Sequence, residues 1–334
     1  MIGELLHRLA ARRDLTREEA AALVDLLAGD GATDAQVGAA LMALAIKGET
    51  ADELAGLAEA MRARAVPVRT RHSIFVDTAG TGGDGAGTFN VSTAAAFVIA
   101  AAGLPVAKHG NRAASSRTGS ADVLRELGAP VEMGPDAAGC ALDELGICFL
   151  FAPLYHAATR RVAEVRRQLG VRTAFNLLGP LTNPARAPRQ VLGVGDPSAI
   201  ERVARAAAAL GVERAWVVHG DGLDEVTVTG PTRVAEVRDG RYIGEIEITP
   251  RDFGLAIRSR HELAGGDPAE NATIVRRTLS GEGSGAARDI VVANAAAGLL
   301  VGGVAATLEE GVERATRAVD SGAAIDLLER FCAR

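Results

Sequence analysis

Two segments of this sequence combine the residue types that bind phosphate groups. A glycine-rich loop, Gly80–Gly85, follows the apolar run Ile74–Val76 and precedes an apolar helical pattern. Glycines between a strand and a helix let backbone N–H groups approach an anion, and the helix N-terminus adds partial positive charge. The second segment, Lys108–Arg117, contains three cations. Together the segments predict a site for a polyanionic ligand. The alternatives are a purely structural turn and a solvated basic loop.

The distribution of charge supports this interpretation. The chain of 334 residues has 36 Lys and Arg against 42 Asp and Glu, yet residues 85–121 contain no acid. Only two of the basic residues are lysines, so Lys108 beside the glycine loop indicates that a compact ammonium group is needed there. A second acid-free stretch, residues 165–195, contains Arg166 and Arg167. Two basic regions predict two anionic ligands or one long one. Exposed helix residues are the alternative for the two arginines.

Adjacent carboxylates follow a later apolar run. The segment Asp221–Glu225 comes directly after His219-Gly220, where we expect a buried strand to end. Carboxylates at the end of a buried strand are well placed to hold Mg²⁺, which takes oxygen ligands and is often shared with substrate phosphates. The alternative is an Asp-Gly turn with two solvated acids.

Several familiar catalytic patterns are absent from the sequence. The Gly80–Gly85 loop lacks the acid that follows a dinucleotide fingerprint by about twenty residues, and no Gly-Lys-Ser/Thr completes a Walker loop. His109, His156 and His219 lie next to the segments above, but none has the partner pattern of a nucleophilic triad or zinc-ligand spacing. We therefore assign no general base.

Composition excludes further classes of protein. Apolar residues make up 48% and charged residues 23%, as in soluble globular proteins, and the net charge of −6 disfavours a broad basic face for nucleic acid. Residues 1–14 lack a signal-peptide pattern. The uncharged stretch Ile290–Leu308 predicts a buried core helix rather than a membrane span. Cys140, Cys148 and Cys332 are expected to be small core residues of a cytoplasmic protein.

The first seventy residues predict helices. Three hydroxyl–acid or hydroxyl–amide pairs have capping-box spacing: Thr16 with Glu19, Thr33 with Gln36, and Thr50 with Glu53. Gly29 and Gly48 stand where left-handed helix ends are expected. We expect an all-helical N-terminal domain over residues 1–69.

From residue 70 the pattern changes to strands alternating with helices. Strands are expected at Ile74–Val76, Pro105–Ala107, Ile147–Phe151, Val191–Val194 and Ala215–Val218, with helices over Ser92–Ala102 and Val123–Leu127. Residues 226–248 predict a hairpin with turns at Gly230-Pro231 and Asp239-Gly240, and helices return from Asp267. This alternation predicts an α/β sheet covered on both faces.

Seven segments, taken together and in order, resemble the anthranilate phosphoribosyltransferase family. They are Gly80–Asp84, Asn90–Thr93, Lys108–Ser116, Gly119–Leu124, Val165-Arg166, Arg172–Pro184 and Asp221–Glu225. The resemblance covers essentially the whole chain. It implies a small helical domain (residues 1–69, completed by a segment near 165–185) that mediates dimerisation. This domain is hinged to a larger α/β domain (70–334) with a central mixed sheet, of the nucleoside phosphorylase and phosphoribosyltransferase kind.

The resemblance also assigns ligands to residues. Phosphoribosyl pyrophosphate is expected along Gly80, Gly83, Asp84, Thr88, Asn90, Val91, Ser92, Thr93, Lys108, His109, Gly110, Asn111, Arg112, Ala113, Ala114, Ser115, Ser116 and Ser120. Two Mg²⁺ ions are expected on Ser92, Asp224 and Glu225, and anthranilate against Gly80, Asn111 and Arg166. Lys108 and Arg166 would act electrostatically.

The sequence departs from the family at one place, and two other functions compete. After His156 the family often has Pro and Met, where this chain has Ala157-Ala158-Thr159, so tolerance of substrate analogues is the property affected. The alternatives are a pyrimidine nucleoside phosphorylase and a non-catalytic nucleic-acid-binding relative of the same fold. By resemblance we also expect a homodimer formed through the N-terminal helices, where Leu5, Leu6 and Leu9 accompany Leu41 and Leu44.

Overall fold

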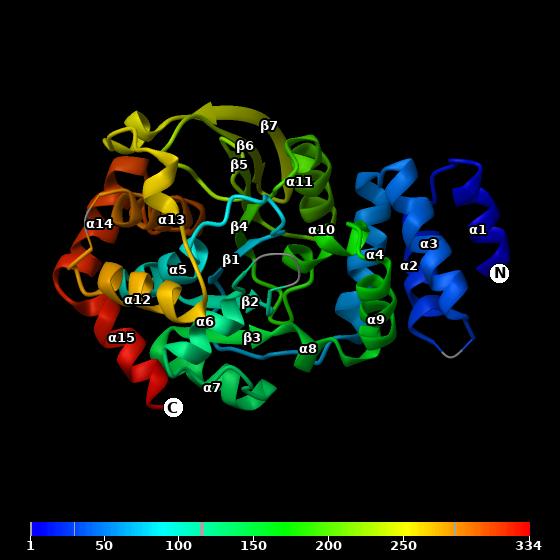
Figure 1. Cartoon of the computed structure of the whole chain (residues 1–334), viewed down its shortest axis with the longest axis horizontal. Coiled ribbons are helices and arrows are strands. Elements are labelled where there is room, and N and C mark those ends of the chain that lie inside the picture. The colour runs from blue at the N-terminus through cyan, green and yellow to red at the C-terminus, as the bar shows by residue number, and fades with distance from the viewer. Residues whose placement is uncertain (1, 30, 114–116, 284) are drawn as a thin grey trace.

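The computed structural model describes residues 2–29, 31–113, 117–283 and 285–334 (Figure 1). Its helices are α1 (Ile2–Ala10), α2 (Arg17–Ala28), α3 (Asp34–Lys47), α4 (Ala51–Arg64), α5 (Val91–Ala101), α6 (Ser120–Glu126), α7 (Pro135–Leu145), α8 (Ala152–Tyr155), α9 (Arg160–Leu169), α10 (Ala174–Leu181), α11 (Ile200–Ala209), α12 (Pro268–Leu279), α13 (Ala286–Gly302), α14 (Leu308–Asp320) and α15 (Ala323–Cys332). Its strands are β1 (Val76–Gly80), β2 (Val106–Gly110), β3 (Ile147–Phe151), β4 (Arg189–Gly193), β5 (Arg214–Gly220), β6 (Thr232–Arg238) and β7 (Arg241–Ile248). Three predicted phosphate contacts, Ala114, Ser115 and Ser116, lie outside the described residues.

The N-terminal helices begin where the capping boxes predict. Thr16, Thr33 and Thr50 each accept a hydrogen bond from the backbone N–H three residues on, and the acid or amide there accepts one from the backbone N–H of the threonine. The prediction for Gly29 is wrong, because this residue has φ −82° and ends α2 in an extended conformation. Gly48 does have positive φ, at 84°.

The sheet is mixed, as expected. Its order is β3-β2-β1-β4-β5-β6-β7, in which β1 to β5 are parallel and the hairpin β6–β7 is antiparallel. Asp239-Gly240 forms the hairpin turn. The strands β1 and β2 continue three residues or more beyond the predicted apolar runs, because polar side chains at their carboxyl ends find partners inside the protein.

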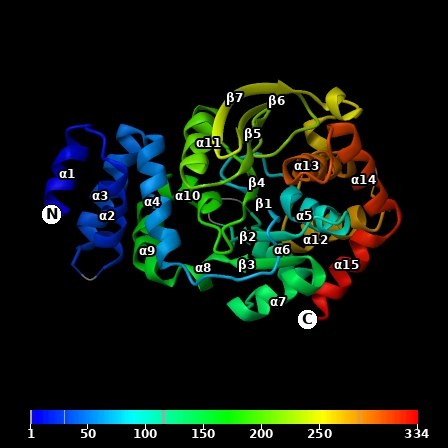
Figure 2. The same ribbon diagram turned by 180° about the vertical axis from the view of Figure 1, so that it is seen from behind.

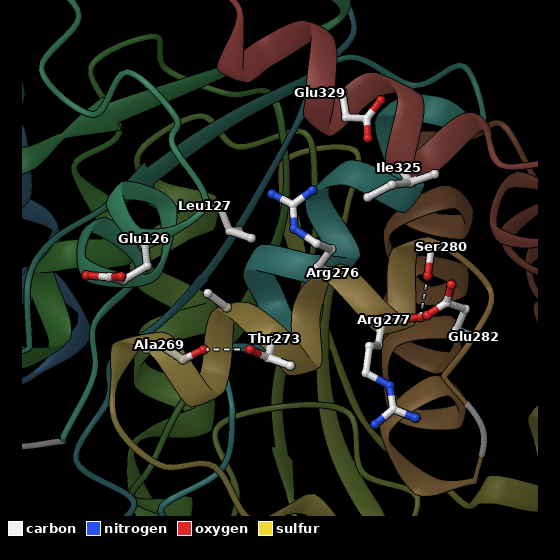
Figure 3. Close-up of a pocket in the computed structure, with 11 residues that line it drawn as sticks. Glu126, Leu127, Ala269, Thr273, Arg276, Arg277, Ser280, Glu282, Ile325 and Glu329 are labelled. Atoms are coloured by element: carbon white, nitrogen blue, oxygen red, sulfur yellow. Dashed lines mark hydrogen bonds between the residues drawn. The ribbon is translucent and has the colours of Figure 1, made fainter.

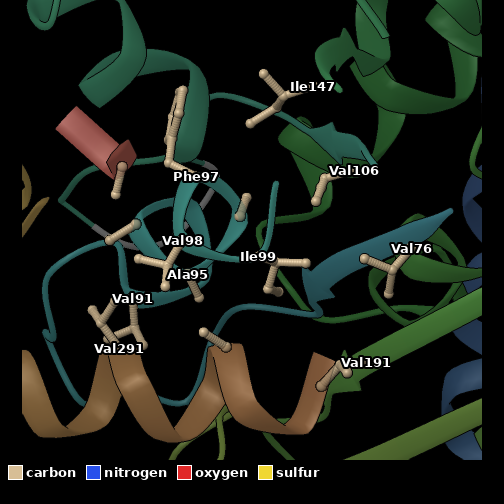
Figure 4. Close-up of a cluster of buried hydrophobic side chains, with 14 of the residues drawn as sticks. Val76, Val91, Ala95, Phe97, Val98, Ile99, Val106, Ile147, Val191 and Val291 are labelled. Atoms are coloured by element: carbon tan, nitrogen blue, oxygen red, sulfur yellow. The ribbon is translucent and has the colours of Figure 1, made fainter. Parts of the chain in front are cut away.

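Helices cover both faces of the sheet. Figures 1 and 2 show α1–α4 and α9 at one end of the molecule and α12–α15 at the other, with the sheet between them. On one face, Val91 and Val98 of α5 lie near Val291 of α13 (Figure 4). On the other face, one hydrophobic core runs from the N-terminal helices through α10 and α11 to β4 and β5. The domain boundary near residue 70 stays a prediction.

Two further expectations concern single elements. The core helix predicted over Ile290–Leu308 is α13, most of whose residues are buried, but it ends at Gly302, so the last six residues of the expected helix lie beyond it. Within the described residues, no helix has the length and apolar character needed to cross a membrane. Cys148 is buried and Cys332 half-buried, but Cys140 is exposed. The core prediction for Cys140 is therefore wrong, because it lies on the outer face of α7 while Ala138, Ala141 and Leu142 face inward.

Candidate active site

Four neighbouring strands end in glycine at one edge of the sheet. Gly80, Gly110, Gly193 and Gly220 are the last residues of β1, β2, β4 and β5, and the parallel direction brings these ends together. A Cβ atom on Gly80 would overlap the carboxylate of Asp224, and one on Gly193 would overlap the Asp224 backbone. The glycines therefore allow the acidic loop to lie directly across the strand ends.

Asp224 and Glu225 on this loop contact the glycine loop and the start of α5. The Asp224 carboxylate accepts a hydrogen bond from the Gly82 N–H at 2.7 Å, and the Glu225 carboxylate accepts one from the Ser92 N–H at 3.1 Å. Burial, helped by the charge of Asp84, raises the pKa of Asp224 to about 7. Burial, helped by the charge of Asp224, raises the pKa of Glu225 to about 8. Carboxylates whose negative charge is this unfavourable form a fitting donor set for a divalent cation.

Lys108 places an ammonium group in the same cluster. Its Nζ donates hydrogen bonds to the Thr78 carbonyl and, at 3.2 Å, to the Ser92 hydroxyl. Burial lowers the pKa of Lys108, while nearby carboxylates, Asp77 first among them, oppose that shift. The other lysine, Lys47, is also enclosed, between two carboxylates. Both lysines thus occupy confined sites that suit a compact ammonium better than a guanidinium.

The glycine loop depends on left-handed backbone. Gly82 and Gly83 have φ values of 65° and 72°, which disfavour any residue with a Cβ. Asp84 accepts hydrogen bonds from the Ala86 N–H at 3.0 Å and from the Asp224 N–H at 3.4 Å, so its carboxylate connects the glycine loop to the acidic loop. Arg172 donates to the Gly83 carbonyl at 2.8 Å. The loop thereby contacts the second basic region of the chain.

The start of α5 presents backbone N–H groups to this cluster. Asn90 is the N-cap residue, but its side chain makes no capping hydrogen bond and instead accepts one from Asn271 at 3.1 Å. Val91, Ser92 and Thr93 form the first turn. The N–H groups of Val91 and Thr93 donate to the Phe89 and Asn90 carbonyls, and that of Ser92 donates to Glu225, so the helix start favours an anion through its partial positive charge rather than through free N–H groups.

Arg166 of the second basic region lies on α9 and contacts α10. The Nη2 of Arg166 donates to the Asn176 side-chain oxygen at 3.3 Å, and the guanidinium lies 5.5 Å from the centre of the Phe175 ring. Its Nε is buried with no hydrogen-bond partner, and among the described residues no carboxylate pairs with Arg166. Arg167 forms an exposed ion pair with Glu164 instead. Arg166 is therefore prepared for an anion, and Arg167 is not.

Two histidines lie between the basic regions. His109 shares a hydrogen bond of 3.0 Å with the carbonyl of Gly179 on α10, and its ring centre is 5.2 Å from that of His156. Burial lowers the pKa of His109 to about 3 and that of His156 to about 4. Both imidazoles are neutral at physiological pH.

The remaining predicted residues lie less deeply. Asn111 and Arg112 are exposed, and Arg112 is 3.7 Å from Glu132. The Ser120 hydroxyl donates to the Asn111 carbonyl at 3.2 Å, which keeps α6 close to the end of β2. Thr88 pairs with Ala264 in an isolated bridge. These residues border the cluster without entering it.

A separate cavity lies away from this cluster. It has a volume of about 480 Å³ between α6, α12 and α15, and Figure 3 shows Arg276 among residues of these three helices. Its lining includes none of the predicted site residues. The cavity does not contribute to the chemistry at the strand ends.

Two polar residues of the site were missed by sequence reasoning. Asp77 lies inside β1 and Asn183 follows α10, and both are fully buried. The signal for Asp77 was an acid directly after the apolar run Ile74–Val76, which that reasoning placed beyond the end of the strand.

The close approach at Gly193 can be tested by adding one methyl group. Gly193→Ala is expected to push the Asp224 loop off the strand ends, because the overlapping atoms are backbone. We expect at least a tenfold loss of activity and, as overpacking typically costs about 1–3 kcal/mol, a lower melting temperature. Gly134→Ala, where the new Cβ meets no atom within 4 Å, is the matched control. Wild-type activity in Gly193→Ala would show that the loop position does not matter.

The fold and the site define a class of protein. A helical bundle precedes an α/β unit whose parallel strand ends carry a glycine loop, a buried lysine and paired carboxylates. Residues 3–65 match the helical bundle domain of a glycosyl transferase family, and residues 72–325 match the a/b domain of that family. The protein is thus a glycosyltransferase by architecture.

Individual relatives narrow the class. The chain is 54% identical to the anthranilate phosphoribosyltransferase of Anaeromyxobacter sp. (strain Fw109-5), over 100% of this chain and 98% of the relative, and 51% identical to that of Moorella thermoacetica over the same shares. A crystal structure of the Thermus thermophilus enzyme matches with a TM-score of 0.93 and 45% identity over 98% of both chains. The Saccharomyces cerevisiae enzyme in complex with PRPP and Mg matches with a TM-score of 0.90 and 28% identity, over 99% of this chain and 97% of that one. The chain belongs to the anthranilate phosphoribosyltransferase family, as its motifs predicted.

Proposed function

We propose that this enzyme transfers the phosphoribosyl group of 5-phosphoribosyl 1-pyrophosphate to the amine of anthranilate, as in tryptophan biosynthesis. The products are N-(5-phosphoribosyl)anthranilate and pyrophosphate. The observation that carries the proposal is the convergence of Lys108, Asp224 and Glu225 at the strand ends, together with Arg166, which contacts Asn176 of α10 and pairs with no carboxylate of the described residues. The family membership supports this function over both alternatives.

The phosphates would bind where N–H groups and cations converge. The loop Gly80–Asp84 offers backbone donors, the N-terminus of α5 adds partial positive charge, and Lys108 supplies a full positive charge beside them. Displacing pyrophosphate from the ribose C1 builds negative charge on the leaving group. A fixed ammonium group and fixed N–H donors stabilise that charge without reorganising.

The acidic loop would hold two Mg²⁺ ions. The hydroxyl of Ser92 and the carboxylates of Asp224 and Glu225 are oxygen donors that lie together, and the raised carboxyl pKa values favour a cation there. The metal ions would neutralise the pyrophosphate leaving group. The yeast relatives solved with Mg bound support this proposal.

Anthranilate would bind between Arg166, Asn111 and Gly80. The planar guanidinium of Arg166 suits a bidentate contact with the carboxylate. An aromatic amine needs positioning more than deprotonation, which fits a site whose buried histidines, with pKa values of about 3 and 4, are weak bases. The short helical turn Ala157–Thr159 beside His156 would then affect tolerance of substituted anthranilates.

The assembly and location are also proposals. Of the five leucines that motivated the homodimer, Leu6 is half-buried, and Leu5, Leu9, Leu41 and Leu44 are buried within one chain, so these four do not supply an open apolar face. Ile46 of α3, by contrast, is a large apolar side chain that is 62% exposed to solvent and so is available to a second copy. We retain the homodimer on family resemblance, and light scattering that shows a monomer at micromolar concentration would contradict it. We also propose a cytoplasmic location, which suits the three free cysteines.

The function is tested directly by fluorescence. Anthranilate should lose its fluorescence when phosphoribosyl pyrophosphate and Mg²⁺ are added with the enzyme, and omission of any one component should prevent the loss. Phosphate with pyrimidine nucleosides should give no reaction. Turnover of nucleosides in place of anthranilate would overturn the proposal.

A further inference from the structure

The sheet is split between β1 and β2 at the edge that carries the site. These strands pair only at Val76 and Val106, whereas β1 pairs with β4, and β2 with β3, along five residues. Beyond that point the two strands cannot satisfy each other's backbone groups. Buried backbone groups are almost always paired, so other partners must fill the gap.

Two buried side chains take over those hydrogen bonds. The Asp77 carboxylate accepts a hydrogen bond from the His109 N–H at 3.0 Å. The Asn183 amide donates to the Ala107 carbonyl at 2.8 Å and to the second Asp77 oxygen at 2.7 Å. The side-chain oxygen of Asn183 in turn accepts from the Ala185 N–H at 2.8 Å. Asp77 and Asn183 thus form a wedge that bonds to β2 on both sides of Lys108.

Burying the Asp77 carboxylate in the middle of the sheet costs free energy of folding. Burial raises the pKa of Asp77 to about 6 although Lys108, Asn183 and the His109 N–H all favour its charged form. Apolar residues at such positions would pack a sheet at lower cost. We therefore infer that the wedge serves to position the end of β2 rather than to stabilise the fold.

The wedge also connects the strand end to α10. Three consecutive carbonyls at the end of this helix are each contacted by a side chain from another element: Gly179 by His109 of β2, Pro180 by Gln190 of β4, and Leu181 by Arg62 of α4. Asn183 follows directly. One turn earlier on α10, Asn176 contacts Arg166. The position of β2 relative to Arg166 therefore depends on how α10 and its following loop are attached to the sheet.

We propose that Asp77 and Asn183 are positioning residues, whose hydrogen-bonded wedge sets the place of Lys108 and His109 relative to α10 and so aligns the two substrates for transfer. This inference rests on the proposed function, because it assumes that the phosphates lie at Lys108 and the aromatic acid at Arg166. Each ligand keeps its own contacts when the wedge is weakened. Weakening the wedge should therefore misalign the two substrates in the transition state and lower kcat, while leaving the binding of each substrate nearly unchanged.

The test begins with Asp77→Asn. The new amide oxygen can still accept from the His109 N–H, but the new NH₂ group faces the NH₂ group of Asn183, so two donors meet where a donor met an acceptor. We expect kcat to fall by about ten- to a hundredfold, with both KM values within about threefold of wild type, at a temperature where the variant is fully folded. The reciprocal double variant Asp77→Asn/Asn183→Asp restores a donor–acceptor pair and should recover part of the loss. Thr278→Val is the control for lost stability, since Thr278 is buried on α12 and its hydroxyl donates to the Ile274 carbonyl of the same helix, away from the wedge and from α10. It should lower stability without lowering kcat.

A second measurement is independent of turnover. Amide hydrogen exchange in Asp77→Asn should become at least about tenfold faster in the peptide that covers β2, while β4 stays protected. Unchanged exchange in β2, or a kcat equal to that of wild type in a less stable protein, would overturn the proposal. So would an equal loss of kcat in Thr278→Val. If wild type does not convert anthranilate at all, the proposed function fails, but the exchange result still decides whether the wedge places β2.

Discussion

The double variant Asp224→Asn/Glu225→Gln is expected to lose at least about a thousandfold in magnesium-dependent use of phosphoribosyl pyrophosphate, while keeping its fold. The amides have almost the volume of the carboxylates but bind Mg²⁺ weakly, and metal ions contribute several kcal/mol to stabilising charge in a transition state. The Gly82 and Ser92 N–H groups, which donate to these side chains, keep an oxygen acceptor in either amide. Initial rates over a series of Mg²⁺ concentrations measure the effect.

The same variant should be more stable than wild type in the absence of metal, and the difference should depend on pH. The carboxyl pKa values of about 7 and 8 lie above the ordinary values of 3.8 and 4.5. Between about pH 4 and 8 the folded protein therefore holds protons that the unfolded chain has released, so wild-type stability falls as the pH rises through this window. The double variant has amides in place of these two carboxyl groups, so its stability does not fall with pH in this way. Its advantage should grow from pH 5 to pH 8, by a few degrees of melting temperature at about 2–4 °C per kcal/mol.

Asp221→Asn is the control for both measurements. Asp221 is an exposed acid on the same loop, but its carboxylate accepts a hydrogen bond from Thr229 and does not contact the cluster. Asparagine also tolerates its φ of 49°. Near-normal turnover of the double variant at low Mg²⁺ would show that the metal assignment is wrong, and so would an equal loss in Asp221→Asn.

Local sequence signals predicted the elements well where the chain satisfies its own backbone groups. The capping boxes at Thr16, Thr33 and Thr50 mark helix starts because donor and acceptor are three residues apart in the chain. The strand Ile147–Phe151 was predicted at its observed bounds, since it is uniformly apolar. The exposed face of α7 was missed because a lone cysteine carries no information about which side of a helix it occupies.

The site was predictable in part for a different reason. Glycines, Lys108 and the acidic pair are conspicuous as residue types, so their chemistry could be inferred before their positions were known. The partners of Asp77 lie far along the chain, with Asn183 more than a hundred residues away, and no spacing rule connects them. The same holds for the attachment of Arg62 to Leu181. Long-range hydrogen bonds that replace strand pairing emerge only from the folded arrangement.

Replacing Arg166 with alanine is expected to raise the KM for anthranilate about ten- to a hundredfold and to change the KM for phosphoribosyl pyrophosphate far less. The loss corresponds to one charge-assisted hydrogen bond, roughly 1.5–3 kcal/mol. Burial lowers the pKa of Arg166, and its Nε has no partner in the structure, so the desolvation of the guanidinium is not offset by an anion until one binds. Arg166→Lys should recover only part of the affinity, because an ammonium group cannot reproduce the planar fork.

Arg167→Ala provides the matched control on the neighbouring position. The Arg167 side chain is 74% exposed and pairs with Glu164 on its own helix, and surface pairs of this kind contribute little. Its removal should leave both KM values unchanged. Steady-state kinetics in which each substrate is varied separately decide the matter, because a residue that merely supports α10 through Asn176 would lower kcat or raise both KM values together. Equal changes in the two KM values of Arg166→Ala, or no change, would show that Arg166 does not select the aromatic acid and that the second basic region serves another purpose.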